Sequence, residues 1–326
     1  MHLVLNSYGA SLRREDNLFA VSSAEGKQLI PPAEVRSISV SKGARISSDA
    51  VLLAIAHEID VMFIDGMGKP QGRVWSVQYG SIASIRRHQI EFLYSGRSVA
   101  WVQELLQDKI NGQIGLLLAL QPSLDERGQR LLRNAINSMD DHRNKIRGLS
   151  GELVADLAPT LRGWEGAASR RYFEALAECL PPDYRFAQRS RTPATDRFNA
   201  LLNYGYGMLY GKVEGALIRA GLDPYTGVFH RDDYNRPALV YDVIERYRVW
   251  VDYVVVQLCR QEAFTDDCFR AEGEGLLLDG LGKRILIQSV NDYLAEIIDL
   301  RGLRRSRAEH IQRYAHELAK TFGGEP

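Results

Sequence analysis

Cysteine is scarce in this 326-residue sequence, and long apolar runs are absent. The three cysteines, Cys179, Cys259 and Cys268, form no C-x-x-C pair, and their odd number indicates free thiols in a reducing cytosol. No stretch of about 18 residues is continuously apolar, which argues against a transmembrane helix. The first residues, M-H-L-V-L-N-S-Y-G, lack the basic and apolar regions of a signal peptide. We therefore expect a soluble cytoplasmic protein without a membrane partner.

The net charge is zero, because 41 basic residues balance 41 acidic ones. A nucleic-acid-binding protein usually shows clustered positive charge, but a neutral total does not exclude a basic stripe on one face. The apolar content of 45% can build a sizeable core, and the chain is long enough for two domains. Composition thus bounds the size of the fold and leaves the function open.

Residues 1–80 show the pattern of a small β-domain. Short runs rich in Val, Ile and Leu are broken at regular intervals by turn signals. Ser47 is the expected N-cap of one helix, Ser48–Glu58, within this region. The expected strands are His2–Asn6, Ala10–Arg14, Leu18–Ser22, Lys27–Ile30, Val35–Val40 and Val61–Asp65, and Arg73–Val77 is a candidate for the start of another hairpin.

From about Ser84 the hydrophobic period changes to three or four residues, which is typical of helices. Residues 81–326 are therefore expected to form a larger, all-helical catalytic domain, and the whole chain an α+β protein. The expected helices are Ile85–Tyr94, Val99–Ile110, Ile114–Leu120, Arg127–Asn137, Glu152–Leu157, Trp164–Leu180, Phe198–Ala220, Leu239–Glu262, Ile285–Leu300 and Ser306–Thr321.

The segment Leu239–Glu262 is rich in β-branched residues, so a strand is the alternative to a helix there. Val243 and Ile244 stand side by side, which breaks the alternation that a strand requires. On a helix, Asp242 and Glu245 share one face at a spacing of three residues. We therefore expect one long helix that presents two carboxylates together.

Two carboxylates and an imidazole are the strongest candidates for chemistry. Glu165 stands in G-W-E-G-A-A-S, His230 closes G-L-D-P-Y-T-G-V-F-H, and Glu245 lies in Y-D-V-I-E-R-Y. Oxygen ligands with a single nitrogen suit Mg²⁺ or Mn²⁺. Each residue alone has a simpler interpretation. His230 is then a surface or core histidine, Glu165 a solvated residue near a helix start, and Glu245 the ion-pair partner of an arginine such as Arg248.

Together with the block N-A-L-L-N-Y-G-Y-G-M-L-Y, these segments resemble, in this order, the CRISPR-associated integrase. That family is the larger of the two proteins that insert new spacers into CRISPR arrays, and the resemblance spans nearly the whole chain. It implies that Glu165, His230 and Glu245 are the metal ligands and catalytic residues. Asp242 matches a recurrent carboxylate of the family and takes a supporting role. After Glu245, Arg246 and Tyr247 stand where the family commonly has Pro and Phe. This difference leaves the ligands intact.

The resemblance also implies a β-domain followed by a helical domain, and a metal-dependent DNA integrase and endonuclease. In that chemistry, a DNA 3′-hydroxyl of the spacer attacks a phosphodiester of the CRISPR repeat, and the divalent metal polarises the phosphate. His230 is either a metal ligand or a proton donor to the leaving oxygen, and the sequence does not separate these roles. The implied assembly is a homodimer joined through the β-domain, bridged by a small ferredoxin-like partner.

A polar connector in the middle of the helical region carries four arginines, Arg185, Arg189, Arg191 and Arg197. We expect them to contact DNA phosphates, and the alternative is an ordinary solvated face. Tyr204 follows in the family block. It is a candidate for stacking on a splayed base, although a tyrosine on an apolar helix more often packs in the core.

Two other functions fit the same fold. One is a transposon-borne integrase that inserts mobile DNA, and the other is a catalytically silent, architectural DNA-binding protein. The intact set of Glu165, His230 and Glu245 argues against silence, and neighbouring genes would distinguish spacers from transposon ends.

Overall fold

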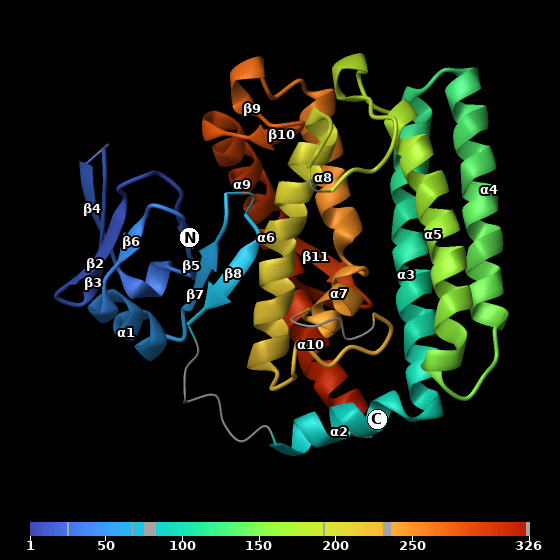
Figure 1. Ribbon diagram of the computed structural model, residues 1–326, viewed down its shortest axis with the longest axis horizontal. Helices are drawn as coiled ribbons and strands as arrows, with labels where there is room; N and C mark the ends of the chain where they lie inside the picture. The colour runs from blue at the N-terminus through green and yellow to red at the C-terminus, as the bar shows by residue number, and fades with distance from the viewer. Residues whose placement is uncertain (25, 67, 75–82, 192, 231–235, 324–326) are drawn as a thin grey trace. The chain divides into compact units, whose positions relative to one another are not determined.

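The computed structural model describes residues 1–323, apart from residues 25, 67, 75–82, 192 and 231–235 (Figure 1). The chain divides into two compact units, Met1–Gly80 and Ser81–Pro326, and each has a hydrophobic core of its own. The first unit, the β-domain, consists mainly of strands, and the second, the helical domain, mainly of helices. The predicted α+β class is therefore confirmed.

Two four-stranded sheets enclose the core of the β-domain. Their strands are β1 (His2–Leu5), β2 (Ser11–Glu15), β3 (Leu18–Ser23), β4 (Gly26–Ile30), β5 (Ser37–Ser41), β6 (Arg45–Ile46), β7 (Asp60–Ile64) and β8 (Pro70–Arg73). The strand orders are β1-β5-β7-β8 and β4-β3-β2-β6. Helix α1 (Ser48–Ala56) begins as predicted, with the Ser47 hydroxyl accepting the Ala50 N–H at 3.2 Å. The predicted Arg73–Val77 segment falls mostly outside the described residues.

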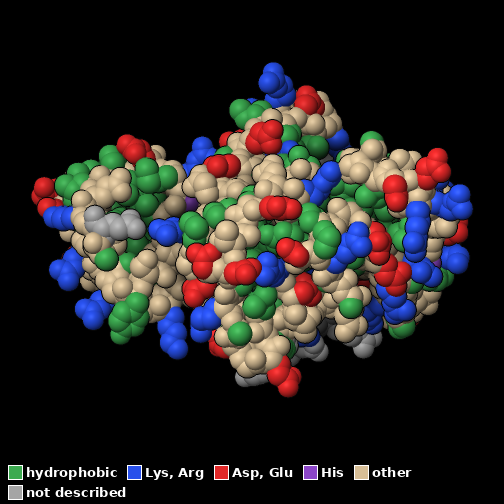
Figure 2. All heavy atoms as spheres, turned by 90° about the horizontal axis from the view of Figure 1, so that it is seen from above, with side chains coloured by type: hydrophobic (Ala, Val, Ile, Leu, Met, Phe, Trp, Pro, Cys, Tyr) green, Lys and Arg blue, Asp and Glu red, His purple; other side chains and the backbone are tan. Residues whose placement is uncertain are grey.

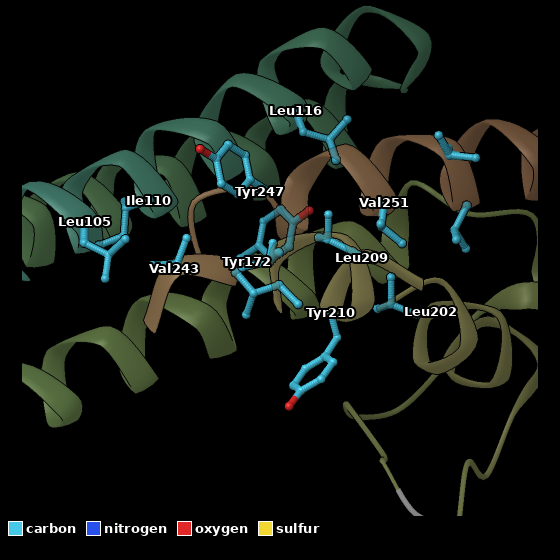
Figure 3. Close-up of a cluster of buried hydrophobic side chains, with 14 of the residues drawn as sticks. Leu105, Ile110, Leu116, Tyr172, Leu202, Leu209, Tyr210, Val243, Tyr247 and Val251 are labelled. Atoms are coloured by element: carbon cyan, nitrogen blue, oxygen red, sulfur yellow. The ribbon is translucent and has the colours of Figure 1, made fainter. Parts of the chain in front are cut away.

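The helices of the second unit are α2 (Ala83–Leu93), α3 (Gly96–Leu120), α4 (Glu126–Gly148), α5 (Val154–Glu178), α6 (Arg197–Arg219), α7 (Ala238–Ile244), α8 (Arg248–Arg260), α9 (Gly280–Ala295) and α10 (Arg307–Gly323). Helices α3, α4 and α5 pack against one another, and α8 contacts both α3 and α6 (Figure 1). Figure 3 shows Tyr172 of α5, Leu209 of α6 and Val251 of α8 meeting in the core. Among the described residues, no helix is long and apolar enough to cross a bilayer.

Helix α3 is continuous where the sequence suggested two helices, Val99–Ile110 and Ile114–Leu120. The glycine between them, Gly112, does not interrupt it. A Cβ atom at this position would lie 3.0 Å from Val249 Cγ1 of α8. The glycine therefore permits close packing of α3 against α8, and the prediction of a break was wrong.

Helix α5 is also continuous, although Glu152–Leu157 and Trp164–Leu180 were expected to be separate. It passes through Pro159, which lacks the N–H for one helical hydrogen bond. Ala158 and Leu161 are buried in the core on either side. Burial of this face offsets the lost bond, so packing decides the helix against local propensity.

The single helix predicted over Leu239–Glu262 is wrong, because a tight turn separates α7 from α8. The N–H groups of Glu245, Arg246 and Tyr247 donate to carbonyls three residues back, as in a 3₁₀ turn. The turn holds Arg246 against Asp108 of α3. That contact joins residues far apart in the chain, so hydrophobic periodicity could not reveal it.

The helix predicted over Ile285–Leu300 ends early, because its last residues form a strand. The helical domain contains two hairpins, β9 (Phe269–Glu272) with β10 (Gly275–Leu278), and β11 (Ile297–Leu300) with β12 (Leu303–Ser306). Arg301 and Gly302 join β11 to β12 with φ angles of 55° and 79°. Two consecutive positive φ values match the right-handed twist of a two-residue hairpin.

Candidate active site

The three predicted ligands come from separate elements of the helical domain. Glu165 lies in α5, His230 lies in the segment after α6, and Glu245 ends α7 at the tight turn. All three line one cavity of about 540 Å³. Its other charged or hydrogen-bonding residues include Lys109, Ser169, Arg170, Arg189, Arg191 and Arg248. The fold therefore gathers the residues that the sequence motifs singled out.

The two glutamates converge on the ammonium group of Lys109 in α3. Lys109 Nζ hydrogen-bonds to Glu165 Oε1 and lies 2.6 Å from Glu245 Oε2. Ser169 Oγ donates to the same oxygen of Glu165 at 2.8 Å. Arg248 Nη2 lies 3.2 Å from Glu245 Oε1, so the ion pair expected as the simpler interpretation is also present.

These charges control the ionisation of the buried groups. Burial disfavours the Glu245 carboxylate, but Arg248 and Lys109 outweigh burial and lower the pKa of Glu245 to about 2. Burial likewise opposes the charge on Lys109. The carboxylates of Glu245 and Glu165 outweigh it and raise the pKa of the ammonium above its usual value. The Glu245 carboxylate is therefore ionised at neutral pH.

Asp242 fixes the orientation of His230. The fully buried Asp242 carboxylate accepts His230 Nδ1–H at 2.7 Å and the His230 backbone N–H at 2.8 Å. Because a carboxylate can only accept here, the Nδ1 atom carries the proton. The other ring nitrogen, Nε2, is left to act as a ligand or a base. Asp242 therefore contacts His230 directly, and its supporting role in catalysis stays a prediction.

The donor set fits a hard divalent cation such as Mg²⁺ or Mn²⁺. Two carboxylate oxygens already face a single positive charge, and an oriented imidazole lines the same cavity. Within the described part of the chain, no three His, Cys, Asp or Glu side chains are grouped closely enough to hold a metal as they stand. In this arrangement the Lys109 ammonium lies between the two carboxylates.

A buried polar network lies next to the cavity. Tyr172 and Tyr206 donate their hydroxyls to the Asp252 carboxylate at 2.7 and 2.5 Å. The guanidinium groups of Arg189 and Arg248 lie 5.5 and 4.8 Å from the centre of the Tyr206 ring. The network connects α5, α6 and α8 and holds two of the cavity arginines in place.

Of the residues predicted to bind DNA, Arg189 and Arg191 line the cavity. Arg189 donates to the side-chain oxygens of Asn199 and Asn203, both at 2.6 Å. These hydrogen bonds also join the polar connector before α6 to α6 itself. Tyr204 is only 4% exposed. Its burial favours the core alternative over base stacking.

The other two predicted arginines have acidic partners outside this cavity. Arg197 pairs with Asp266 at 2.6 Å, and Arg185 lies 3.8 Å from Glu178. On the face drawn in Figure 2, basic and acidic side chains are interspersed. No broad basic surface therefore marks a DNA path among the described residues on that face.

Sequence reasoning did not assign Lys109 or Arg170 to the site. A signal for Lys109 was present, because it occupies a position of the apolar stripe of α3, one turn after Leu105 and beside Ile110. A lysine in such a stripe needs a buried anion as partner. Arg170 follows the Glu165 motif on an exposed stretch of α5, where sequence offers no comparable signal.

The chain thus combines a β-domain with a helical domain whose cavity gathers glutamates, a histidine and several arginines. The family described as CRISPR associated protein Cas1 matches residues 3–292. This chain belongs to the Cas1 family, which confirms the resemblance seen in its motifs.

One relative, the CRISPR-associated endonuclease Cas1 of Archaeoglobus fulgidus, is 31% identical over 339 residues. The match covers 100% of this chain and 97% of the relative. A casposase bound to its integration product has a TM-score of 0.83 at 19% identity, over 99% of this chain and 90% of that one. A Cas6-RT-Cas1–Cas2 complex has a TM-score of 0.81 at 21% identity, over 99% of this chain and 35% of that one. These two structures are similar in fold.

Proposed function

We propose that this protein is a metal-dependent DNA integrase and endonuclease that inserts spacer DNA into a CRISPR array. One observation carries the proposal. Carboxylates from α5 and α7 meet at a single cation, beside an imidazole oriented by Asp242, in a cavity lined by arginines. Membership of the Cas1 family supports DNA as the substrate.

The residues of the site have distinct tasks in this reaction. Glu165, Glu245 and His230 Nε2 would hold Mg²⁺ or Mn²⁺, which would polarise the scissile phosphate and lower the pKa of the attacking 3′-hydroxyl. The hydroxyl releases its proton as its oxygen forms a new bond to phosphorus, and the bond from phosphorus to the target strand's 3′-oxygen breaks as that oxygen takes up a proton. Arg191 and Arg248 provide positive charge for the phosphate oxygens in the cavity. Positioning and electrostatics supply most of the rate.

The proposed assembly is a cytoplasmic homodimer with a small, ferredoxin-like partner. The Cas1–Cas2 complex with a chain of the same fold supports a Cas2-type partner. We expect the dimer contact in the β-domain, whose two open sheets end in the edge strands β1 and β8, and β4 and β6. Edge strands carry unpaired backbone groups that another chain can cover.

A transposon-borne integrase remains the second candidate, and the fold shared with a casposase favours it. The two candidates use the same chemistry and differ in the DNA that they join. A catalytically silent DNA-binding protein is less well supported, because the carboxylates and the oriented imidazole are all present in one cavity.

A strand-transfer assay tests the proposal. The protein is incubated with a short duplex and Mn²⁺, with and without the small partner, and with a supercoiled plasmid that carries CRISPR repeats. We expect integration at the repeat, and its loss in Glu165→Gln, His230→Ala and Glu245→Gln with DNA binding retained. Activity that persists in EDTA, or in any of these variants, contradicts the assigned ligands. A strict requirement for transposon ends on the donor duplex would favour the second candidate.

A further inference from the structure

Lys109 carries a charge that the proposed chemistry does not use. It lies on the buried face of α3, and its side chain is only 9% exposed. Burial of a lone ammonium is costly, so a buried lysine needs anionic partners. Its partners are Glu165 and Glu245, which are the two carboxylates assigned above to the metal.

The ammonium contacts one oxygen of each glutamate that is assigned to the metal. Lys109 Nζ hydrogen-bonds to Glu165 Oε1, and it lies 2.6 Å from Glu245 Oε2. The second contact is not an aligned hydrogen bond, because Glu245 Oε2 has no donor in hydrogen-bonding geometry among the described residues. The negative charge on this oxygen is therefore stabilised mainly by the nearby positive charge of Lys109. A divalent ion would provide a larger positive charge.

The ammonium and a metal ion cannot share this position. Bonds from Mg²⁺ to its oxygen ligands are about 2.0–2.1 Å long, so an ion bound to both oxygens would stand next to Nζ. Like charges at such a separation repel strongly where water is excluded. Metal binding therefore requires the ammonium to move, and the cavity that Lys109 lines gives it space.

The metal-free site depends on the same ammonium. Without it, Glu165 would retain the hydroxyl of Ser169, and Glu245 the guanidinium of Arg248. Two neighbouring carboxylates with one cation fewer between them would repel each other. Lys109 thus keeps the two glutamates next to each other in the metal-free protein.

We propose that Lys109 is an internal cation that holds Glu165 and Glu245 together in the metal-free protein and is displaced when a divalent ion binds. The inference rests on the proposed function, because it takes these glutamates as metal ligands. Lys109 is then a positioning residue, and its competition sets the metal concentration at which the site fills.

Calorimetric titration of the full chain with Mn²⁺, in the absence of DNA, tests the competition. Lys109→Met removes the charge and keeps an apolar stem. We expect it to bind Mn²⁺ about tenfold more tightly. A neighbouring charge commonly changes the affinity of a carboxylate for a proton by that factor or more, and we expect a similar effect on a metal ion. Lys145→Met, at an exposed position of α4, is the matched control and should bind like the wild type. Unchanged or weaker binding by Lys109→Met overturns the proposal.

Thermal unfolding in EDTA tests the holding role. Lys109→Met should unfold at a lower temperature than the wild type, and Mn²⁺ should raise its Tm by more than it raises that of the wild type. The double variant Lys109→Met with Glu165→Gln restores the charge balance and should regain stability in EDTA. A wild-type Tm for Lys109→Met in EDTA overturns the proposal. If Lys109→Met does not fold, Lys109→Gln is measured in both experiments with the same expectations.

The titration separates this inference from the proposed function. If the heat of Mn²⁺ binding to the wild-type protein is absent, or is unchanged by Glu165→Gln, the proposed metal site itself is wrong. If Glu165→Gln removes the heat and Lys109→Met leaves the affinity unchanged, the metal site stands and only the displaced lysine is wrong.

Discussion

Asp242 is the residue on which the position of His230 depends. Its buried carboxylate accepts the backbone N–H groups of Val228, Phe229 and His230 and the ring N–H of His230. Four donors compensate the removal of the charge from water. One side chain therefore fixes the loop backbone and the imidazole tautomer. A carboxylate behind a metal-binding histidine commonly has this function.

Asp242→Asn should weaken Mn²⁺ binding by about 10–100-fold, because the amide cannot accept all four hydrogen bonds and no longer holds the ring. Calorimetric titration measures the affinity, and Asp141→Asn, at an exposed site on α4, is the matched control. An unchanged affinity in a variant with a lowered Tm would restrict Asp242 to supporting the loop.

Asp252 is a second buried carboxylate, and its pKa is raised. Burial raises the pKa of Asp252 from 3.8 to about 6, against the hydrogen bonds from Tyr206 and Tyr172 that favour the charged form. The folded protein therefore binds the proton of the Asp252 carboxyl group more tightly than the unfolded chain does. The stability that the proton contributes is complete below about pH 4 and is lost as the pH rises through about 6.

Asp252→Asn should remove this pH dependence. The free energy of unfolding of the wild type, relative to the variant, should fall by up to about 3 kcal/mol between about pH 4 and pH 7. Urea unfolding at several pH values measures the difference, and Asp141→Asn should show none of this trend. A constant difference between wild type and Asp252→Asn would mean that Asp252 stays ionised across the range.

At the scale of elements, the helical domain depends on the close approach of α6 and α8. A Cβ atom at Gly205 of α6 would lie 2.5 Å from Val251 Cγ1 of α8, which is far inside van der Waals contact. The same two helices carry Tyr206 and Asp252 of the buried network. Their separation therefore sets both the packing of the core and the geometry beside the cavity.

Gly205→Ala should destabilise the protein by about 1–3 kcal/mol, because the core must shift to admit the methyl group. The matched control is Gly163→Ala in α5, where the added Cβ atom meets nothing within 4 Å. That change should be neutral or stabilising by up to about 1 kcal/mol, since alanine favours the helix. Urea unfolding measures both, and equal effects would contradict the close-packing argument.

At the scale of the whole molecule, two hydrophobic cores divide the chain. The β-domain core and the helical-domain core are formed by separate sets of residues. Every candidate ligand and every arginine of the cavity belongs to the helical domain. Each protomer therefore contains a complete set of the proposed ligands, whatever its oligomeric state.

A chain that begins at Ala83 should fold, bind Mn²⁺ with near-normal affinity and run as a monomer, because the proposed dimer contact lies in the β-domain. Light scattering measures its mass, and the full-length protein at the same concentration is the control. A stable dimer of the shortened chain would place the interface in the helical domain. Loss of Mn²⁺ binding in a folded monomer would show that the site needs the dimer.

The sequence by itself determined the features that depend on neighbours along the chain. The change of hydrophobic period near Ser84 predicted where strands give way to helices, and Ser47 was readable as an N-cap because a cap acts within one turn. The motifs singled out Glu165, His230 and Glu245, which the fold gathers around one cavity. Their role as metal ligands stays a prediction until metal binding is measured.

The tertiary structure alone decided where helices continue, where they break and which charges meet. Gly112 does not end α3, and the side chain of Val249 in α8 packs closely against it. The helix breaks after α7, where Arg246 is held against Asp108 of α3. Lys109 belongs to the site because α3, α5 and α7 converge there. Contacts between residues this far apart in the chain depend on packing and burial, which outweigh the small local propensities that a sequence pattern records.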